Sequence, residues 1–139
     1  MRVLIDTNII LDFQLERAPF LQDAETLFAA ISSGQIVGYV TATTLTDIFY
    51  IARRHTQSVE RAKQAVEFAL AIMEVCPVNR AVLETAITSA VPDFEDAVQV
   101  ACVISQGLDA IVTRDRNFVS TSVSVLSVTQ VFQQLKSND

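Results

Sequence analysis

Short strands of β-branched and apolar residues alternate with amphipathic helices along the whole chain, and this alternation most constrains its fold. Strands are expected at residues 2–6, 36–41, 75–78, 110–115 and 122–128. Helices are expected at residues 7–13, 20–33, 44–54, 59–75 and 79–91, from Asp93 to a stop at Gly107, and at 129–135. Such alternation is typical of a parallel sheet covered on both faces. The sequence therefore predicts an α/β protein, a three-layer α/β/α domain with a central, mostly parallel twisted sheet.

The length of 139 residues suits one domain, expected to span residues 1–139. Half of the residues are hydrophobic and 19% are charged, which excludes a disordered chain. No apolar run has the length of a membrane span, and the N-terminus lacks the pattern of a signal peptide. We therefore expect a soluble, cytoplasmic protein.

The cysteines and the histidine exclude some metal sites. Cys76 and Cys102 lie in apolar segments without metal-ligand spacing, so reduced core residues are expected, with a disulfide or redox role as the lesser alternative. His55 is the single histidine. A zinc site that needs two histidines is therefore excluded.

The formal net charge is −6, from 16 acidic and 10 basic residues. A nucleic-acid-binding protein usually has a basic patch, so this charge argues against one. If four of the acids belong to a metal site, however, the remaining charge is −6 + 4 = −2. Composition thus leaves nucleic-acid binding open.

Four aspartates occupy positions that a parallel sheet brings to one edge. They follow strands or lie in the first turns of helices: Asp6, Asp47, Asp96 and Asp115. Ligands of open α/β sheets bind at this carboxyl edge. Four like charges in one place require a cation, and carboxylate oxygens suit Mg²⁺ or Mn²⁺.

Each aspartate also has an ordinary explanation. Asp6 has the position of a helix cap, and Asp96 suits the first turn of a helix. Asp47 could be a solvated helix residue and Asp115 a turn residue. Asp93, three residues before Asp96, is expected to be an N-cap rather than a ligand. The ordinary explanation is the better one for each residue alone, but the convergence of four acids favours a site.

Three segments resemble the PIN-domain family, small metal-dependent nucleases that include the VapC-type toxins of toxin–antitoxin pairs. These segments are VLIDTNIILD, TATTLTDIFYIARR and PDFEDAVQVACVISQGLDAIVTRD, in the family's order. The resemblance carries the family's four acids onto the same four aspartates. In two places the chain departs from it: Asp47 stands where many members have glutamate, and Asn117 where members often have an acid, so Asn117 is not counted as a ligand.

The resemblance implies cleavage of RNA phosphodiester bonds with bound Mg²⁺ or Mn²⁺ as cofactor. It implies that Asp6, Asp96 and Asp115 are the main metal ligands, and that Asp47 is a ligand or orients the attacking water. A metal ion suits a chain without a plausible serine or cysteine triad or a Gly-rich phosphate loop, because the ion lowers the pKa of bound water. The resemblance further implies a cognate antitoxin and a homodimer.

Four further residues are expected to support this chemistry. Asn8 and Thr113 would hold the carboxylates by hydrogen bonds. Arg114 and Arg116 flank Asp115 and would contact RNA phosphates, although solvated arginines are the ordinary alternative.

Two other functions compete with the nuclease. One is a non-catalytic PIN-like protein-interaction module, which the presence of all four acids disfavours. The other is an aspartate-nucleophile phosphatase, which would need a second aspartate two residues after Asp6, where the chain has Asn8.

Overall fold

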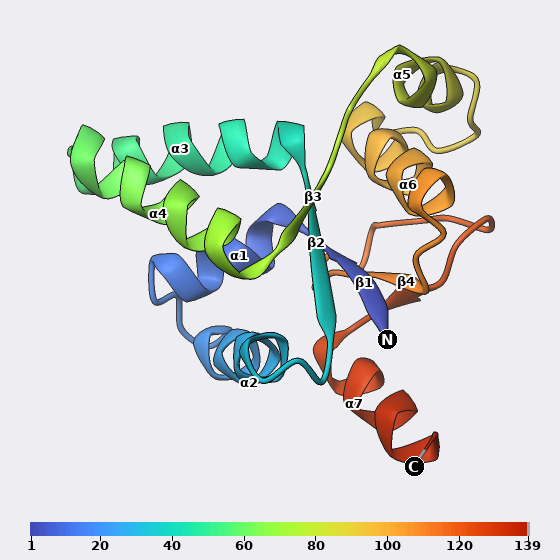
Figure 1. Ribbon diagram of the computed structural model, residues 1–139. Coiled ribbons are helices and arrows are strands. Elements are labelled where there is room, and N and C mark those ends of the chain that lie inside the picture. The colour runs from blue at the N-terminus through green and yellow to red at the C-terminus, as the bar shows by residue number, and fades with distance from the viewer. Residues whose placement is uncertain (139) are drawn as a thin grey trace.

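The computed structural model describes residues 1–138; Asp139, the last residue of the expected domain, lies outside the described residues. Five strands and seven helices form within residues 1–138 (Figure 1). The strands are β1 (Arg2–Ile5), β2 (Val37–Thr41), β3 (Glu74–Cys76), β4 (Ala110–Val112) and β5 (Val125–Leu126). The helices are α1 (Thr7–Gln14), α2 (Leu21–Ser32), α3 (Ala42–Thr56), α4 (Val59–Ile72), α5 (Arg80–Ile87), α6 (Phe94–Gln106) and α7 (Val128–Ser137).

The strands form one parallel sheet in the order β3-β2-β1-β4-β5, which confirms the predicted α/β class. β1 is central, with β2 on one side and β4 on the other. Ile5 at the end of β1 pairs with Val112 at the end of β4. The residues that follow, Asp6 and Thr113, therefore emerge side by side at the carboxyl edge of the sheet.

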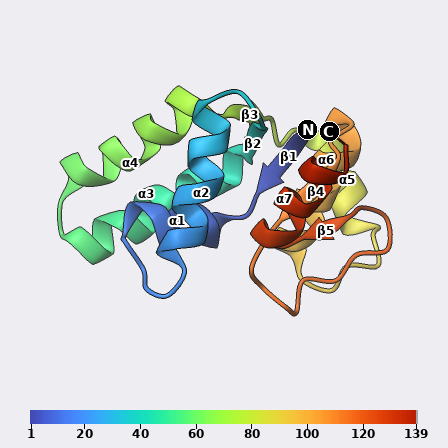
Figure 2. The same ribbon diagram turned by 90° about the horizontal axis from the view of Figure 1, so that it is seen from below.

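Both faces of the sheet are covered by helices, as predicted (Figures 1 and 2). Val3 and Ile5 of β1 belong to a core shared with α1, α2, α3, α4 and α7. Leu4 points the other way and packs with α5 and α6. This alternation is the two-residue period of a strand buried on both faces. Cys76 and Cys102 are buried free cysteines in the second core.

Some elements begin or end elsewhere than the sequence predicts. The helix expected over 59–75 stops at Ile72, because Met73 has an extended backbone and the next residues join the sheet as β3. The helix expected over 79–91 ends at Ile87. The strand expected over 122–128 shrinks to two residues, because Ser127 caps α7 in a capping box with Gln130.

The helix ends carry the signals expected of them. Asn79 and Asp93 are N-caps whose side chains accept hydrogen bonds from backbone N–H groups. Gly107 ends α6 in the left-handed conformation, with φ of 63°, which glycine adopts without strain. Across residues 1–138, no helix combines the length and apolar character needed to cross a membrane.

Candidate functional site

Asp6 is a buried carboxylate held by three hydrogen bonds at the end of β1. Its Oδ1 accepts from the backbone N of Thr7 at 2.8 Å and from Nε2 of Gln99 at 3.1 Å. Its Oδ2 accepts from Oγ1 of Thr113 at 2.8 Å. Asp6 is thus the N-cap of α1 and also the point where β1, α6 and the end of β4 meet. Capping and a role in a site are not alternatives here.

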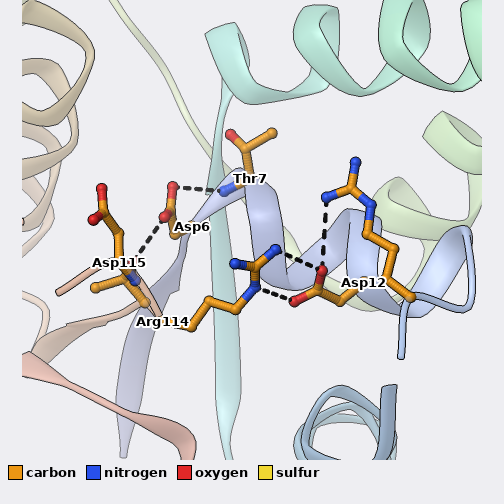
Figure 3. A network of polar contacts seen from close by, with 7 residues as sticks. Asp6, Thr7, Asp12, Arg114 and Asp115 are labelled. Carbon is orange, nitrogen blue, oxygen red and sulfur yellow. Dashed lines mark hydrogen bonds and ion pairs between the residues drawn. The ribbon is translucent and has the colours of Figure 1, made fainter. Parts of the chain in front are cut away.

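Thr113 connects Asp6 to Asp115. Its Oγ1 donates to Asp6 and accepts from the backbone N of Asp115 at 3.0 Å. Asp115 in turn accepts the backbone N–H of Asn117 through Oδ1 at 2.9 Å, which closes a tight turn after β4. These bonds fix both carboxylates on the same rim (Figure 3).

A pocket of about 440 Å³ opens at this carboxyl edge. Six carboxylates line it: Asp6, Asp47, Asp93, Glu95, Asp96 and Asp115. The structure therefore brings together all four aspartates named by the sequence and adds two acids from the start of α6. Asn8 and Gln99 also line the pocket, and Arg54 is the cationic side chain among its lining residues.

The concentration of negative charge raises the pKa of two carboxyls. The pKa of Glu95 rises from 4.5 to about 7, first because its protonated form hydrogen-bonds to Asp47, then through burial and the charges of Asp47, Asp93 and Asp6. The pKa of Asp96 rises from 3.8 to about 6, mainly through burial and then through the charges of Asp93, Asp6 and Asp115. The negative charge of the pocket is therefore not balanced by positive side chains, and its carboxyl groups bind protons more tightly than they do in water.

The donor set of the pocket suits a divalent cation such as Mg²⁺ or Mn²⁺. The donors are hard oxygen atoms, which these ions prefer. Oε1 of the buried Gln99 side chain also has no hydrogen-bond partner among the described residues. A buried acceptor without a partner costs free energy, and a ligand or water in the pocket would remove this cost. Within residues 1–138, no three acidic, cysteine or histidine side chains are already gathered in metal-binding geometry. The carboxylates thus share a pocket without converging on one point, as expected when like charges face each other.

Of the four supporting residues, Thr113 alone donates a hydrogen bond to a site carboxylate, that of Asp6. Asn8 is exposed at the pocket, and no hydrogen bond of its side chain is found within the described chain. Arg116 is exposed and does not line the pocket. Arg114 turns away from the pocket towards Asp12 on α1, as Figure 3 shows.

Arg114 is held by a two-point ion pair. Its Nε and Nη2 donate to the two carboxylate oxygens of Asp12 at 2.7 and 3.1 Å. The hydrogen bond to Asp12 is the main reason that the pKa of Arg114 is raised, and the charges of Asp12, Asp6 and Asp115 add to it. The guanidinium group therefore lies within the field of the acidic pocket while it is bound elsewhere.

Three residues at or near the site were not identified from the sequence. Gln99 is polar in the apolar run AVQVACV and lies three residues after Asp96, so the two share a helix face. Asp12 is likewise an acid within the apolar run of α1. Both could have been found as polar residues at core positions. Glu95 gives no such signal, because an acid in the first turn of a helix is ordinary.

A second hollow adjoins the acidic pocket. It has a volume of about 630 Å³ and is lined by Tyr50, Arg53, Arg54, Gln57 and Val59. Tyr50 and Arg54 line both hollows, so the acidic pocket continues along α3 into a surface with an aromatic ring and two arginines.

Comparisons with known proteins agree on one fold. The model of the PIN domain family matches residues 2–117. The structure of VapC20 from Mycobacterium tuberculosis, a toxin that cleaves the sarcin–ricin loop, superposes with a TM-score of 0.68 at 18% identity, covering 84% of this chain and 92% of that one.

Two toxin–antitoxin structures are similar to a comparable degree. A complex from Klebsiella pneumoniae has a TM-score of 0.67 at 17% identity and covers 91% of this chain and 97% of its own. VapBC2 from Rickettsia felis, bound to a promoter DNA fragment, has a TM-score of 0.68 at 10% identity and covers 91% and 98%. At these identities the structures establish the fold. No curated protein matches the sequence.

Proposed function

The chain belongs to the PIN-domain family, and from this premise we propose that it is a cytoplasmic, divalent-metal-dependent endoribonuclease that hydrolyses RNA phosphodiester bonds. The observation that carries the proposal is the pocket at the carboxyl edge of the sheet, where Asp6, Asp47, Asp96 and Asp115 lie together. Four acids separated by up to 109 positions (115 − 6) share one pocket of about 440 Å³. Their ordinary explanations as separate caps, turns and surface acids do not account for this.

In the proposed mechanism, Asp6, Asp96 and Asp115 hold the metal ion. Bound Mg²⁺ or Mn²⁺ supplies a Lewis acid and a water of lowered pKa. Thr113 and Gln99 fix the orientation of Asp6 by hydrogen bonds to both of its oxygens.

Asp47 on α3 and Glu95 on α6 both line the pocket. The pKa of Glu95 is raised to about 7, mainly because its protonated form hydrogen-bonds to Asp47. In the proposed reaction Asp47 orients the attacking water or completes the ligand set. Below about pH 7, protonation of Glu95 removes one negative charge from the pocket.

The proposed path of the RNA follows the second hollow. The arginines Arg53 and Arg54 suit phosphate groups, and the exposed ring of Tyr50 suits stacking on a base. Since Arg54 and Tyr50 also line the acidic pocket, a strand that lies along α3 leads into it.

The decisive variant is Asp6→Asn, which we expect to abolish metal-dependent RNA cleavage. Asparagine caps a helix about as well as aspartate, so α1 retains its cap. The amide nitrogen, however, replaces one of the two accepting oxygens of Asp6, and a negative charge leaves the pocket. Cleavage of RNA with Mn²⁺ and thermal melting with and without the ion are measured together, and the Mn²⁺-induced rise in Tm is expected to shrink.

Asp93→Asn is the matched control. It also removes one charge from the pocket and keeps an N-cap, here on α6. Most activity should remain, because Asp93 is assigned as a cap rather than a ligand. Wild-type cleavage by Asp6→Asn would refute the nuclease-site assignment. A wild-type protein that binds Mn²⁺ but cuts no RNA would instead favour a non-catalytic interaction module.

We further propose that the nuclease is the toxin of a type II toxin–antitoxin pair. The support is the similarity in fold to toxins and toxin–antitoxin complexes. A cognate antitoxin segment would cover the acidic pocket and offer an arginine to its carboxylates in place of the metal.

Expression of the chain alone should then slow growth of its host, and co-expression of the neighbouring reading frame should restore it. The measurement is the growth rate with each gene and with both, and Asp6→Asn serves as the non-toxic control. Normal growth under strong expression in the native host would contradict the toxin role. It would not contradict the nuclease activity, which the cleavage of RNA in vitro tests independently.

A further inference from the structure

Asp12 is a buried charge outside the site described above. It lies in the last turn of α1 with 1% of its surface exposed. Both carboxylate oxygens pair with Arg114, and Nη1 of Arg17 lies 3.6 Å from Oδ1. The Arg114 side chain is 33% exposed, so Asp12 is the buried member of the pair. A buried carboxylate without a partner costs free energy, and Arg114 supplies the charge that Asp12 needs.

Arg114 stands between two residues of the acidic rim. Thr113 before it bonds to Asp6, and Asp115 after it lines the pocket. The Arg114 side chain points to the other side, towards Asp12 on α1 (Figure 3). There the Cζ atom of its guanidinium lies 3.8 Å from the centre of the Phe20 ring. The direction of this one side chain is therefore set by Asp12 and Phe20.

Without Asp12 and Phe20, Arg114 would have other carboxylates nearby with which to pair. Six acids line the adjacent pocket, and one of them, Asp115, is the next residue in the sequence. An arginine forms strong two-point pairs with carboxylates and cannot lose its charge at neutral pH. Inside the pocket it would occupy the oxygens that a metal ion needs.

We propose that Asp12 is a positioning residue that holds the Arg114 guanidinium out of the acidic pocket and thereby keeps its carboxylates open to a cation. The inference deepens the proposed function and rests on its cation site. The pair has a specific role in this scheme, because it prevents Arg114 from neutralising the carboxylates of the pocket.

The test is Mn²⁺ binding by the purified full-length protein, measured by electron paramagnetic resonance of free Mn²⁺. Asp12→Asn should weaken binding by about tenfold or more, the scale on which an opposite charge a few ångströms away changes ion binding at a carboxylate. The double variant Asp12→Asn/Arg114→Gln should recover wild-type affinity, since it has no arginine to enter the pocket. Arg17→Gln, which leaves the Asp12–Arg114 pair intact, is the control and should bind as the wild type does.

A second pair of variants covers the case in which Asp12→Asn does not fold. Arg114→Lys keeps the positive charge but cannot form the two-point pair, whereas Arg114→Gln removes the charge. The lysine variant should bind Mn²⁺ more weakly than the glutamine variant. Equal affinities of these two, or a double variant no better than Asp12→Asn, would overturn the proposal and leave the pair a purely structural one.

A readout without metal separates this inference from the proposed function. The Nε–Hε NMR signal of Arg114 should show a slowly exchanging, charge-assisted hydrogen bond in the wild type and a different environment in Asp12→Asn. If the wild type binds no Mn²⁺, the cation site itself fails. If the wild type binds and Asp12→Asn binds equally well, the inference alone fails.

Discussion

Arg54 is the cationic side chain that lines both the acidic pocket and the second hollow along α3. If RNA follows this path, Arg54→Gln should weaken RNA binding and reduce its salt dependence. Removing one arginine that binds a phosphate lowers the slope of log affinity against log salt by about 0.7 for a single strand. The measurement is RNA affinity by fluorescence anisotropy at several salt concentrations, in the Asp6→Asn background so that the RNA stays intact.

Arg61→Gln provides the comparison for this loss of one charge. Arg61 is an exposed residue on the neighbouring helix α4 and lines neither hollow. Its replacement should leave the salt slope within error of the parent. Equal effects of the two substitutions would mean that only net charge matters, and the proposed path along α3 would be wrong.

The positions of some residues could be predicted from the sequence, whereas the contacts of others could not. The position of Asp6 follows from one local rule, because a polar residue after a buried strand of a parallel sheet lies at its carboxyl edge. Its bond to Gln99 joins residues 93 positions apart and depends on how α6 packs on the sheet. The direction of Arg114 is equally non-local, since it depends on Asp12 from α1. Sequence reasoning thus found the acids and the hydrogen bond of Thr113 to one of them, and it missed the contacts made by Gln99 and Asp12.

At the scale of elements, the start of α6 carries three of the acids in the pocket: Asp93 is its N-cap, and Glu95 and Asp96 lie in its first turn. The pKa values of Glu95 and Asp96 are raised to about 7 and about 6. The folded protein therefore binds more protons than the unfolded one between about pH 4 and pH 7. The stability due to these two groups is complete below their ordinary pKa values and is lost as the pH rises through 6 and 7.

We accordingly expect the Tm of the metal-free protein to fall as the pH rises from 5 to 8. Glu95→Gln should make this fall smaller, because the neutral side chain no longer loses a proton next to Asp47. Added Mn²⁺ should oppose the fall, since a cation stabilises the deprotonated carboxylates. Melting curves across this range check all three expectations. A Tm that rises with pH equally in the wild type and in Glu95→Gln would contradict them.

The elements themselves were predicted best where local signals are strong. Caps such as Asn79 and Asp93 fix where α5 and α6 begin, and both follow from residue type and spacing. The end of α4 depends instead on the pairing of the next residues with a neighbouring strand. Met73 could continue a helix as well as end one, and it is the pairing of β3 with β2 that decides. A boundary that is set by pairing with a distant strand cannot be predicted from a short stretch of sequence.

At the scale of the molecule, several apolar side chains remain on the surface. The most exposed include Ile87 on α5 at 71%, Val119 at 61% and Ile104 on α6 at 53%. Ile104 and Val119 line one hollow of about 340 Å³. Apolar surface of this kind marks protein contacts, and the expected homodimer would cover it.

We therefore predict that the isolated protein has a solution mass of twice the 15.3 kDa of one chain. Ile104→Glu should shift it towards the monomer, because the dimer would bury an unpaired charge. Leu70→Glu changes a side chain of similar exposure, 51%, on α4 and should leave the dimer intact. Light scattering at micromolar concentration measures the mass, and circular dichroism verifies that each variant is folded. A monomeric wild type would disprove the homodimer. A dimer that persists in Ile104→Glu, or that is lost equally in both variants, would contradict an interface centred on Ile104.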